Sequence, residues 1–246
     1  MFEGKKYTSG DYLFLIKLFQ RTERYSEMVT AINKYVELNP KLSAEERKML
    51  CDGYKNIISS KRNSLRLLSN LNKKEEEEGN QNNHFKQINT IKSKIEDELL
   101  QIFKKIHAML DEYLIPNAQD EESKIFYMKI KADYYRYHCE FAEEEEFEEA
   151  KKNAEKIYKE AYDMSLKDIN IYNSVRLGLA LNYSVFLYEI MDSKNEAYDI
   201  AQKAYDDAMK VVDDVEKDRT SDNLLLIQLL KENLIFWSSE MSEEQN

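Results

Sequence analysis

The chain has 246 residues, of which 34% are charged and 42% apolar, and its formal net charge is −11. Five glycines and two prolines, Pro40 and Pro116, are too few for the turns of a many-stranded sheet, so the composition favours long helices with short connections. The acidic balance argues against general binding to nucleic acid or anionic membranes, and no apolar run approaches the roughly 20 residues that span a bilayer.

Helical periodicity runs through almost the whole chain, and it is clearest in one apolar stripe with three- and four-residue spacing. That stripe consists of Phe85, Ile88, Ile91, Ile95, Leu99, Ile102, Ile106 and Leu110. Ser43 with Glu46 is typical of a capping box, and Pro116 ends a long helix. We therefore predict an all-α protein with nine helices, near residues 8–23, 25–38, 44–72, 84–115, 119–142, 145–168, 173–191, 195–213 and 219–240.

The apolar stripes continue from helix to helix without a linker, so we expect one domain over residues 1–240. The charged, low-complexity composition of residues 72–83 predicts that they form a loop. We expect residues 241–246 to form a disordered acidic tail. The N-terminus lacks the apolar core and cleavage site of a signal peptide, and Cys51 and Cys139 lie outside any CxxC pattern. Both observations indicate a cytoplasmic protein.

A basic stripe stands out at residues 53–66, GYKNIISSKRNSLR, which contain no acid. On a helix, Lys55, Arg62 and Arg66 fall within an arc of about 40°, with the first two about 10 Å apart along the axis. Lys61 points to another side of that helix. The stripe indicates that a negatively charged group is expected on this segment.

A second helix repeats the pattern, because Lys129 and Arg136 are again seven residues apart. Asp133 and Glu140 lie three and four residues from Arg136, where they can orient its guanidinium, and Tyr137 follows it directly. Arginines, a lysine and a tyrosine hydroxyl suit a tetrahedral dianion, because guanidinium forks pair bidentately with phosphate oxygens. The alternative is that both stripes are solvated helix faces with surface ion pairs, which are common.

Four blocks in the same order resemble the 14-3-3 family: GYKNIISSKRNSLR, YLIPNAQDEESKIFYMKIKADYYRY, RLGLALNYSVFLYEI and LLLIQLLKENLIFW. The resemblance runs from about Leu18 to Trp237 and covers most of the chain. It implies nine antiparallel helices in a cup-shaped protomer, a homodimer, and an amphipathic groove in each protomer. The family binds phosphoserine or phosphothreonine peptides in this groove, so the expected negative group is a phosphate.

The resemblance also assigns roles to single residues of the groove. It implies phosphate binding by Lys55, Arg62, Arg136 and Tyr137. It implies contacts with the peptide backbone, or beside it, for Asn182, Asn233, Lys129, Glu189 and Trp237. The apolar wall of the groove corresponds to Leu181, Val185, Leu225, Leu229 and Phe236.

A dimer face is implied by the same resemblance. Its apolar and small positions correspond to Leu18, Thr22, Ser64, Leu68, Leu71 and Ile91. Two ion pairs across the interface are expected, Arg24 with Glu98 and Glu27 with Lys94, and such charges favour register more than affinity. Thr22, Leu65 and Ile91 replace the family's alanine, tryptophan and tyrosine. The expected assembly is a homodimer, or a heterodimer with a paralogue, which binds phosphorylated client proteins and neither enters a membrane nor binds nucleic acid.

No catalytic residue is predicted. His84, His107 and His138 are scattered without zinc-type spacing to a cysteine, and the sequence lacks P-loop and EF-hand patterns. A phosphate-handling hydrolase would need a nucleophile or metal carboxylates beside Arg62 and Arg136. We therefore expect no enzymatic activity, no cofactor and no metal. The alternative function is a TPR-like helical scaffold that binds unphosphorylated partners.

Overall fold

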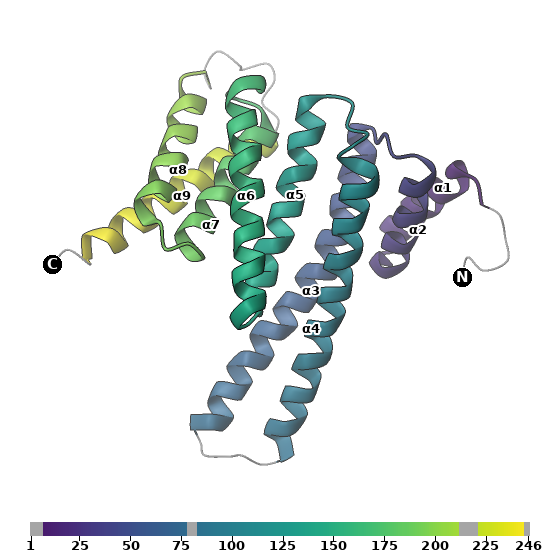
Figure 1. Cartoon of the computed structure of the whole chain (residues 1–246), viewed down its shortest axis with the longest axis horizontal. Coiled ribbons are helices and arrows are strands. Elements are labelled where there is room, and N and C mark those ends of the chain that lie inside the picture. Colours follow the sequence, from purple (N-terminus) through teal and green to yellow (C-terminus); the bar gives the residue numbers. More distant parts are fainter. Residues whose placement is uncertain (1–6, 78–82, 212–220, 244–246) are drawn as a thin grey trace. The chain divides into compact units, whose positions relative to one another are not determined.

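The computed structural model describes residues 7–77, 83–211 and 221–243 (Figure 1). Over these ranges the chain forms nine α-helices and one π-helical turn, with no strand. The predicted all-α class with nine helices is therefore confirmed. The chain separates into two compact units, 1–118 and 119–246, and the single domain expected over residues 1–240 stays a prediction.

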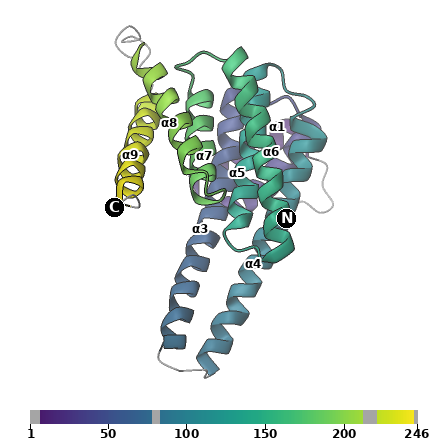
Figure 2. The same cartoon turned by 60° about the vertical axis from the view of Figure 1, so that its left-hand side comes forward.

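The N-terminal unit consists of two short helices, α1 (Ser9–Arg21) and α2 (Tyr25–Leu38), and a long antiparallel hairpin of α3 (Ala44–Glu77) and α4 (Asn83–Met109). Figures 1 and 2 show α3 and α4 side by side along their length. The predicted capping box is present at the start of α3, where the Ser43 N–H donates to Glu46 Oε2 at 2.7 Å and the Glu46 N–H donates to Ser43 Oγ at 3.3 Å.

Close packing of α2 on α3 organises the core of this unit. Gly53 sits at the contact, where an added Cβ would lie only 3.1 Å from Ile32 Cδ1 and 3.2 Å from Val29 Cγ2. One residue further, the buried Tyr54 donates its hydroxyl to Asn33 Oδ1 at 2.6 Å, which satisfies the polar end of an otherwise apolar side chain. The unit thus holds α3 firmly over the turns that carry its basic stripe.

The structure corrects several predicted helix ends. α3 continues to Glu77, so the loop predicted from residue 72 is wrong over 72–77. Lysine and glutamate are good helix formers, and Asn72 Nδ2 donates across the hairpin to Asn89 Oδ1 at 2.5 Å. Residues 78–82 of that predicted loop lie outside the described residues, and its last residue, Asn83, is the first residue of α4.

Two further ends differ. The long fourth helix finishes in a π-helical turn, Leu110–Leu114, in which the Ile115 N–H donates to the Leu110 carbonyl at 2.8 Å. At the other end of the chain, α9 runs to Glu243, so the predicted disordered tail is helical over 241–243, and 244–246 lie outside the described residues.

The C-terminal unit contains five helices: α5 (Glu121–Cys139), α6 (Glu144–Asp168), α7 (Ser174–Glu189), α8 (Lys194–Met209) and α9 (Ser221–Glu243). α5 and α6 form an antiparallel pair, and α7 packs against α5, α6, α8 and α9. Small buried side chains on α6, namely Ala150, Ala154, Ala161 and Ser165, let the neighbouring helices approach closely. None of the described helices is long and apolar enough to cross a bilayer.

Candidate functional site

The first basic stripe lies on α3. Lys55 and Arg66 are exposed and Arg62 is half-buried. Lys61 forms an ion pair with Glu98 of α4, which agrees with the expectation that it points away from the stripe. That ion pair, together with the charge of Lys94, lowers the pKa of Glu98. Lys61 therefore fastens the hairpin, while the stripe faces another direction.

The second stripe lies on α5 and is built around a buried carboxylate. Asp133 is only 6% exposed and Arg136 only 9%. Lys129 Nζ lies 2.8 Å from Asp133 Oδ2, and Arg136 Nη2 lies 3.6 Å from Asp133 Oδ1. Asp133 therefore orients Arg136, as the spacing predicted. The other expected orienter, Glu140, is exposed at the C-terminal end of α5, and its contact with Arg136 stays a prediction.

Two side chains from other helices complete this cluster. Tyr158 of α6 donates its hydroxyl to Asp133 Oδ1 and accepts from Arg136 Nε at 3.2 Å. Asn182 of α7 donates from Nδ2 to both Asp133 oxygens, at 2.8 and 2.9 Å. Three helices therefore meet at one carboxylate. We call Lys129, Asp133, Arg136, Tyr158 and Asn182 the Asp133 cluster.

The charges of the Asp133 cluster are fixed by their surroundings. Burial alone would raise the pKa of Asp133, but the Lys129 and Arg136 cations and the donated hydrogen bonds outweigh burial and hold that pKa below its usual value. Burial, the Asp133 charge and the hydrogen bond to Asp133 raise the pKa of Tyr158 well above its usual value. Asp133 is thus an acceptor only, and Tyr158 keeps its donor proton.

Arg136 also packs against the ring of Tyr137, the next residue in the sequence. Its guanidinium carbon lies 4.7 Å from the centroid of the Tyr137 ring, within the range of a cation–π contact. Tyr137 is half-buried, so the predicted Arg-Tyr pair forms one packed unit at this end of α5. The contact fixes the two side chains relative to each other.

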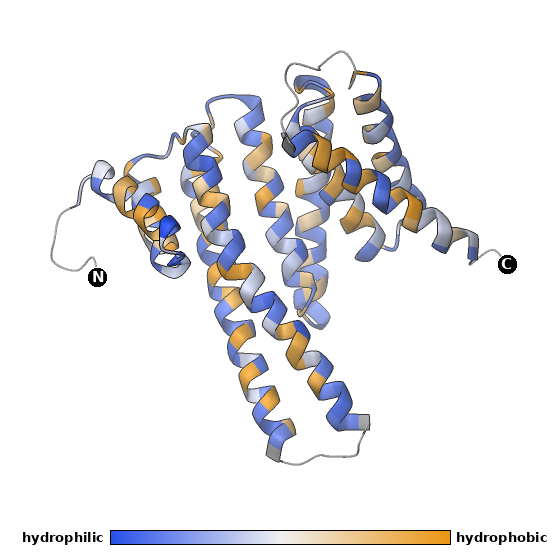
Figure 3. Ribbon diagram, turned by 180° about the vertical axis from the view of Figure 1, so that it is seen from behind, coloured by the Kyte–Doolittle hydropathy of each residue, from blue (hydrophilic) through white to orange (hydrophobic). Residues whose placement is uncertain are grey.

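The predicted groove residues on α7 and α9 differ in their exposure to solvent. Leu225 is 55% exposed, Leu229 36% and Phe236 58%, so α9 carries an exposed apolar strip. Figure 3 shows how much of the helix that ends at C is hydrophobic. Leu181 and Trp237 are buried instead. The half-buried residues are Val185, Asn182 and Asn233, and Glu189 is exposed.

Trp237 has a clear packing role. Its ring stacks on Tyr188 with centroids 4.6 Å apart and planes inclined by 10°. The Tyr188 hydroxyl in turn donates to Glu240 Oε2 at 2.6 Å, which ties α7 to the C-terminal part of α9. The predicted contact of Trp237 with a bound peptide stays a prediction. In the structure, Trp237 packs α9 against α7.

Lys129 lies over the one glycine of α7. A Cβ added to Gly178 would meet Lys129 Cε at 3.5 Å and Leu226 Cδ2 at 3.8 Å. Both distances are ordinary van der Waals contacts, so the lysine stem and Leu226 pack against α7 at this position. Lys129 is half-buried there, with its ammonium on Asp133.

The residues predicted for a dimer face all lie in the N-terminal unit. Leu18, Thr22, Arg24, Lys94 and Ile91 are exposed. The half-buried ones are Glu27, Ser64, Leu68 and Glu98. Within the chain, Arg24 Nε donates to Glu27 Oε1 at 2.9 Å, so the two residues predicted to reach a partner already pair with each other. The pairings across a dimer stay predictions.

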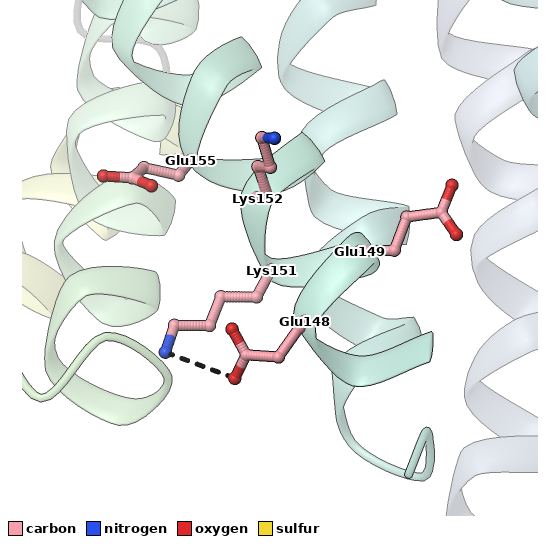
Figure 4. A pocket seen from close by; sticks show the side chains of 5 residues that line it. All are labelled: Glu148, Glu149, Lys151, Lys152 and Glu155. Atoms are coloured by element: carbon pink, nitrogen blue, oxygen red, sulfur yellow. Dashed lines mark ion pairs between the residues drawn. The ribbon is translucent and has the colours of Figure 1, made fainter. Parts of the chain in front are cut away.

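The hollow in Figure 4 is lined by side chains of one helix, α6: Glu148, Glu149, Lys151, Lys152 and Glu155. They point outward in different directions, and Glu148 Oε1 lies 3.9 Å from Lys151 Nζ. Surface pairs of this kind contribute little to stability. We interpret the hollow as a solvated helix face. In the parts of the chain that the structure describes, no group of three or more His, Cys, Asp or Glu side chains is placed to hold a metal ion.

Sequence reasoning missed Tyr158. It lies 22 residues from Arg136 and 25 from Asp133, on another helix, so no local spacing links them. The available signal was a single tyrosine in the otherwise small, buried stripe of α6. The structure brings Lys129, Arg136, Tyr137 and Asn182 together in the C-terminal unit, whereas Lys55 and Arg62 belong to the other unit.

Comparison with known proteins gives a consistent result. The family model described as 14-3-3 protein matches residues 15–238. The chain is 41% identical over 233 residues to 14-3-3-like protein GF14 iota of Arabidopsis thaliana, covering 95% of this chain and 87% of that protein. It is 41% identical over 235 residues to 14-3-3 protein 3 of Entamoeba histolytica (96% and 98% covered) and 42% identical over 231 residues to 14-3-3 protein beta/alpha-1 of Oncorhynchus mykiss (94% and 93%).

The Asp133 cluster predicts a specific dependence of stability on pH. Because the folded-state pKa of Asp133 is lowered, its ionised form stabilises the fold above the unfolded value of about 3.9, and this contribution is lost as pH falls through the folded pKa. Asp133→Asn should therefore lower the free energy of unfolding most near pH 7, and the difference from wild type should shrink below about pH 4.

Urea unfolding measured at several pH values checks this expectation. Asp199→Asn, at an exposed position of α8, is the control and should change the free energy of unfolding by less than about 0.5 kcal/mol. A difference between wild type and Asp133→Asn that does not vary with pH would contradict the assigned charge of Asp133.

Proposed function

The chain belongs to the 14-3-3 family, and we propose from this that it is an adaptor that binds phosphoserine- and phosphothreonine-containing client proteins without chemical turnover. Membership of the family supports the broader role of regulating other proteins through binding. In this proposal the protein acts as a cytoplasmic dimer with one ligand groove in each protomer. Lys55, Arg62, Arg136 and Tyr137 bind the phosphate.

The observation that carries the proposal is the buried, pre-oriented Arg136. A guanidinium that is 9% exposed loses most of its hydration, and Asp133 with Tyr158 compensates for that loss. These two contacts use only part of the five N–H donors of arginine. An oriented fork beside a tyrosine hydroxyl is well suited to phosphate, because bidentate charge-assisted bonds fix both distance and direction.

The exposed apolar strip of α9 supports the amphipathic half of the proposal. Leu225, Leu229 and Phe236 expose large apolar surfaces, which a peptide side chain can cover with a gain of about 25 cal/mol per Å². Val185 of α7 is half-buried and belongs to the same proposed wall. The phosphate supplies charge recognition, and the wall supplies apolar contact to the residues around it.

A titration with paired peptides tests the proposed function. A phosphoserine peptide should bind with a Kd in the micromolar range or below, and the same peptide without phosphate should bind far more weakly. Calorimetry measures both affinities, and the phosphopeptide should be recovered intact after incubation. Equal affinities would favour an unphosphorylated-ligand scaffold, and release of phosphate would favour an enzyme.

Arginine variants test the phosphate site itself. Arg62→Ala and Arg136→Ala each remove a charge-assisted fork, and a lost bond of this type costs roughly 1.5–3 kcal/mol, or about 10- to 150-fold in Kd. Lys159→Ala, which removes an exposed cation of α6, is the matched control and should bind as wild type. If the arginine variants also bind as wild type, the two basic stripes do not serve one ligand.

Charge reversal tests the dimer. Because Arg24 pairs with Glu27 within the chain, the two residues can be exchanged without loss of that ion pair. Exchanging the two residues, Arg24→Glu with Glu27→Arg, keeps that pair but opposes the expected partners Glu98 and Lys94. The variant should dissociate at lower concentrations than wild type in analytical ultracentrifugation. Adding Lys94→Glu and Glu98→Lys, together with Lys61→Glu so that the ion pair between α3 and α4 is kept, should restore the dimer. A monomeric wild type at tens of micromolar would contradict the proposed assembly.

A further inference from the structure

The amide of Asn182 has a defined orientation. Its Nδ2 lies 2.8 and 2.9 Å from the two oxygens of Asp133. A carboxylate only accepts hydrogen bonds, so the nitrogen end of the amide must face it and the carbonyl oxygen must point away. Asn182 is half-buried, so part of the residue remains accessible to a ligand.

The carboxylate that sets this orientation is itself held on several sides. Lys129 and Arg136 lie 2.8 and 3.6 Å from it, and the Tyr158 hydroxyl donates to it. The ring of Tyr158 is 0% exposed and packs on Tyr183, with centroids 5.5 Å apart, and on Phe186 at 5.3 Å. Asp133 therefore has little freedom to turn away from Asn182.

The same groups connect Asn182 with Arg136. Asp133 Oδ1 is shared by the Tyr158 hydroxyl, Arg136 Nη2 and Asn182 Nδ2. Tyr158 also accepts from Arg136 Nε, so one buried hydroxyl contacts both the carboxylate and the guanidinium. A change at Asp133 must alter both Asn182 and Arg136, whereas a change at Tyr158 acts first on Arg136.

The family resemblance assigns Asn182 to the peptide backbone, and we propose that Asp133 and Tyr158 are positioning residues for this contact and for Arg136. Asp133 turns the Asn182 carbonyl oxygen outward, so that it accepts from a backbone N–H of the ligand. The inference rests on the proposed function, because it concerns the same phosphopeptide. Proline or an N-methylated residue at the contacted position should be rejected, since neither has an N–H to donate. Tyr158 holds Arg136 for the phosphate of that ligand.

An ester scan of the ligand tests the role of Asp133. In a series of phosphoserine peptides, one backbone N–H at a time near the phosphoserine is replaced by an ester oxygen. For wild type, one ester in the series should weaken binding by about 2- to 12-fold, as expected for a lost neutral hydrogen bond. This penalty should be absent in Asn182→Ala. It should also shrink in Asp133→Asn, because an asparagine both donates and accepts and no longer fixes the orientation of Asn182.

A pair of tyrosine variants tests Tyr158 even if Asp133→Asn does not fold. Tyr158→Phe keeps the ring and the charges and removes only the hydroxyl, so it should weaken every phosphopeptide by about 2- to 12-fold. Tyr162→Phe, one turn further along α6 and half-buried, is the matched control and should bind as wild type. Circular dichroism confirms that each variant is folded.

The outcomes separate this inference from the proposed function. Phosphate-dependent binding without an ester penalty at any position would overturn the inference and leave the function intact. An undiminished ester penalty in a folded Asp133→Asn, or equal binding by Tyr158→Phe and Tyr162→Phe, would also overturn it. Equal affinity for phosphorylated and unmodified peptides would overturn the proposed function and the inference with it.

Discussion

The buried carboxylate of Asp133 is the constraint on which the C-terminal unit depends. An ion removed from water costs several kcal/mol unless nearby charges and hydrogen bonds compensate it. Here four side chains do so, from α5, α6 and α7. These helices must therefore meet at one point, and the small buried residues around Tyr158 on α6 let them approach closely. The Asp133 cluster orients the side chains that the proposed function uses.

The charged groups of the N-terminal unit differ from the Asp133 cluster, because its basic stripe lies on an exposed helix face. Lys55 and Arg66 remain exposed on α3, while the core of the unit holds the same helix through Gly53, Tyr54 and the ion pair of Lys61. A rigid helix with a solvated cationic face attracts an anion and costs little to keep charged in water. In the proposed function this face supplies charge, and Arg136 supplies the oriented fork.

The helices were predictable from the sequence because their apolar periodicity is strong, and the capping pattern at Ser43 located the start of α3 correctly. The end of α3 was not, because a charged run at residues 72–77 suits a loop by composition and a helix by propensity. The role of Asp133 as an orienter of Arg136 followed from local spacing. Its contacts with Tyr158 and Asn182 did not, because they join residues 25 and 49 positions apart on separate helices. The meeting of the two basic stripes on one phosphate is inferred from family membership, since they lie in different compact units.

A crystal structure of the protein with a bound phosphoserine peptide tests the central claim most directly. We predict that the phosphate oxygens lie about 2.7–3.2 Å from the side-chain nitrogens of Lys55, Arg62 and Arg136 and within hydrogen-bond distance of the Tyr137 hydroxyl. A phosphate that contacts only one of the two basic stripes, or that binds elsewhere on the chain, would contradict it.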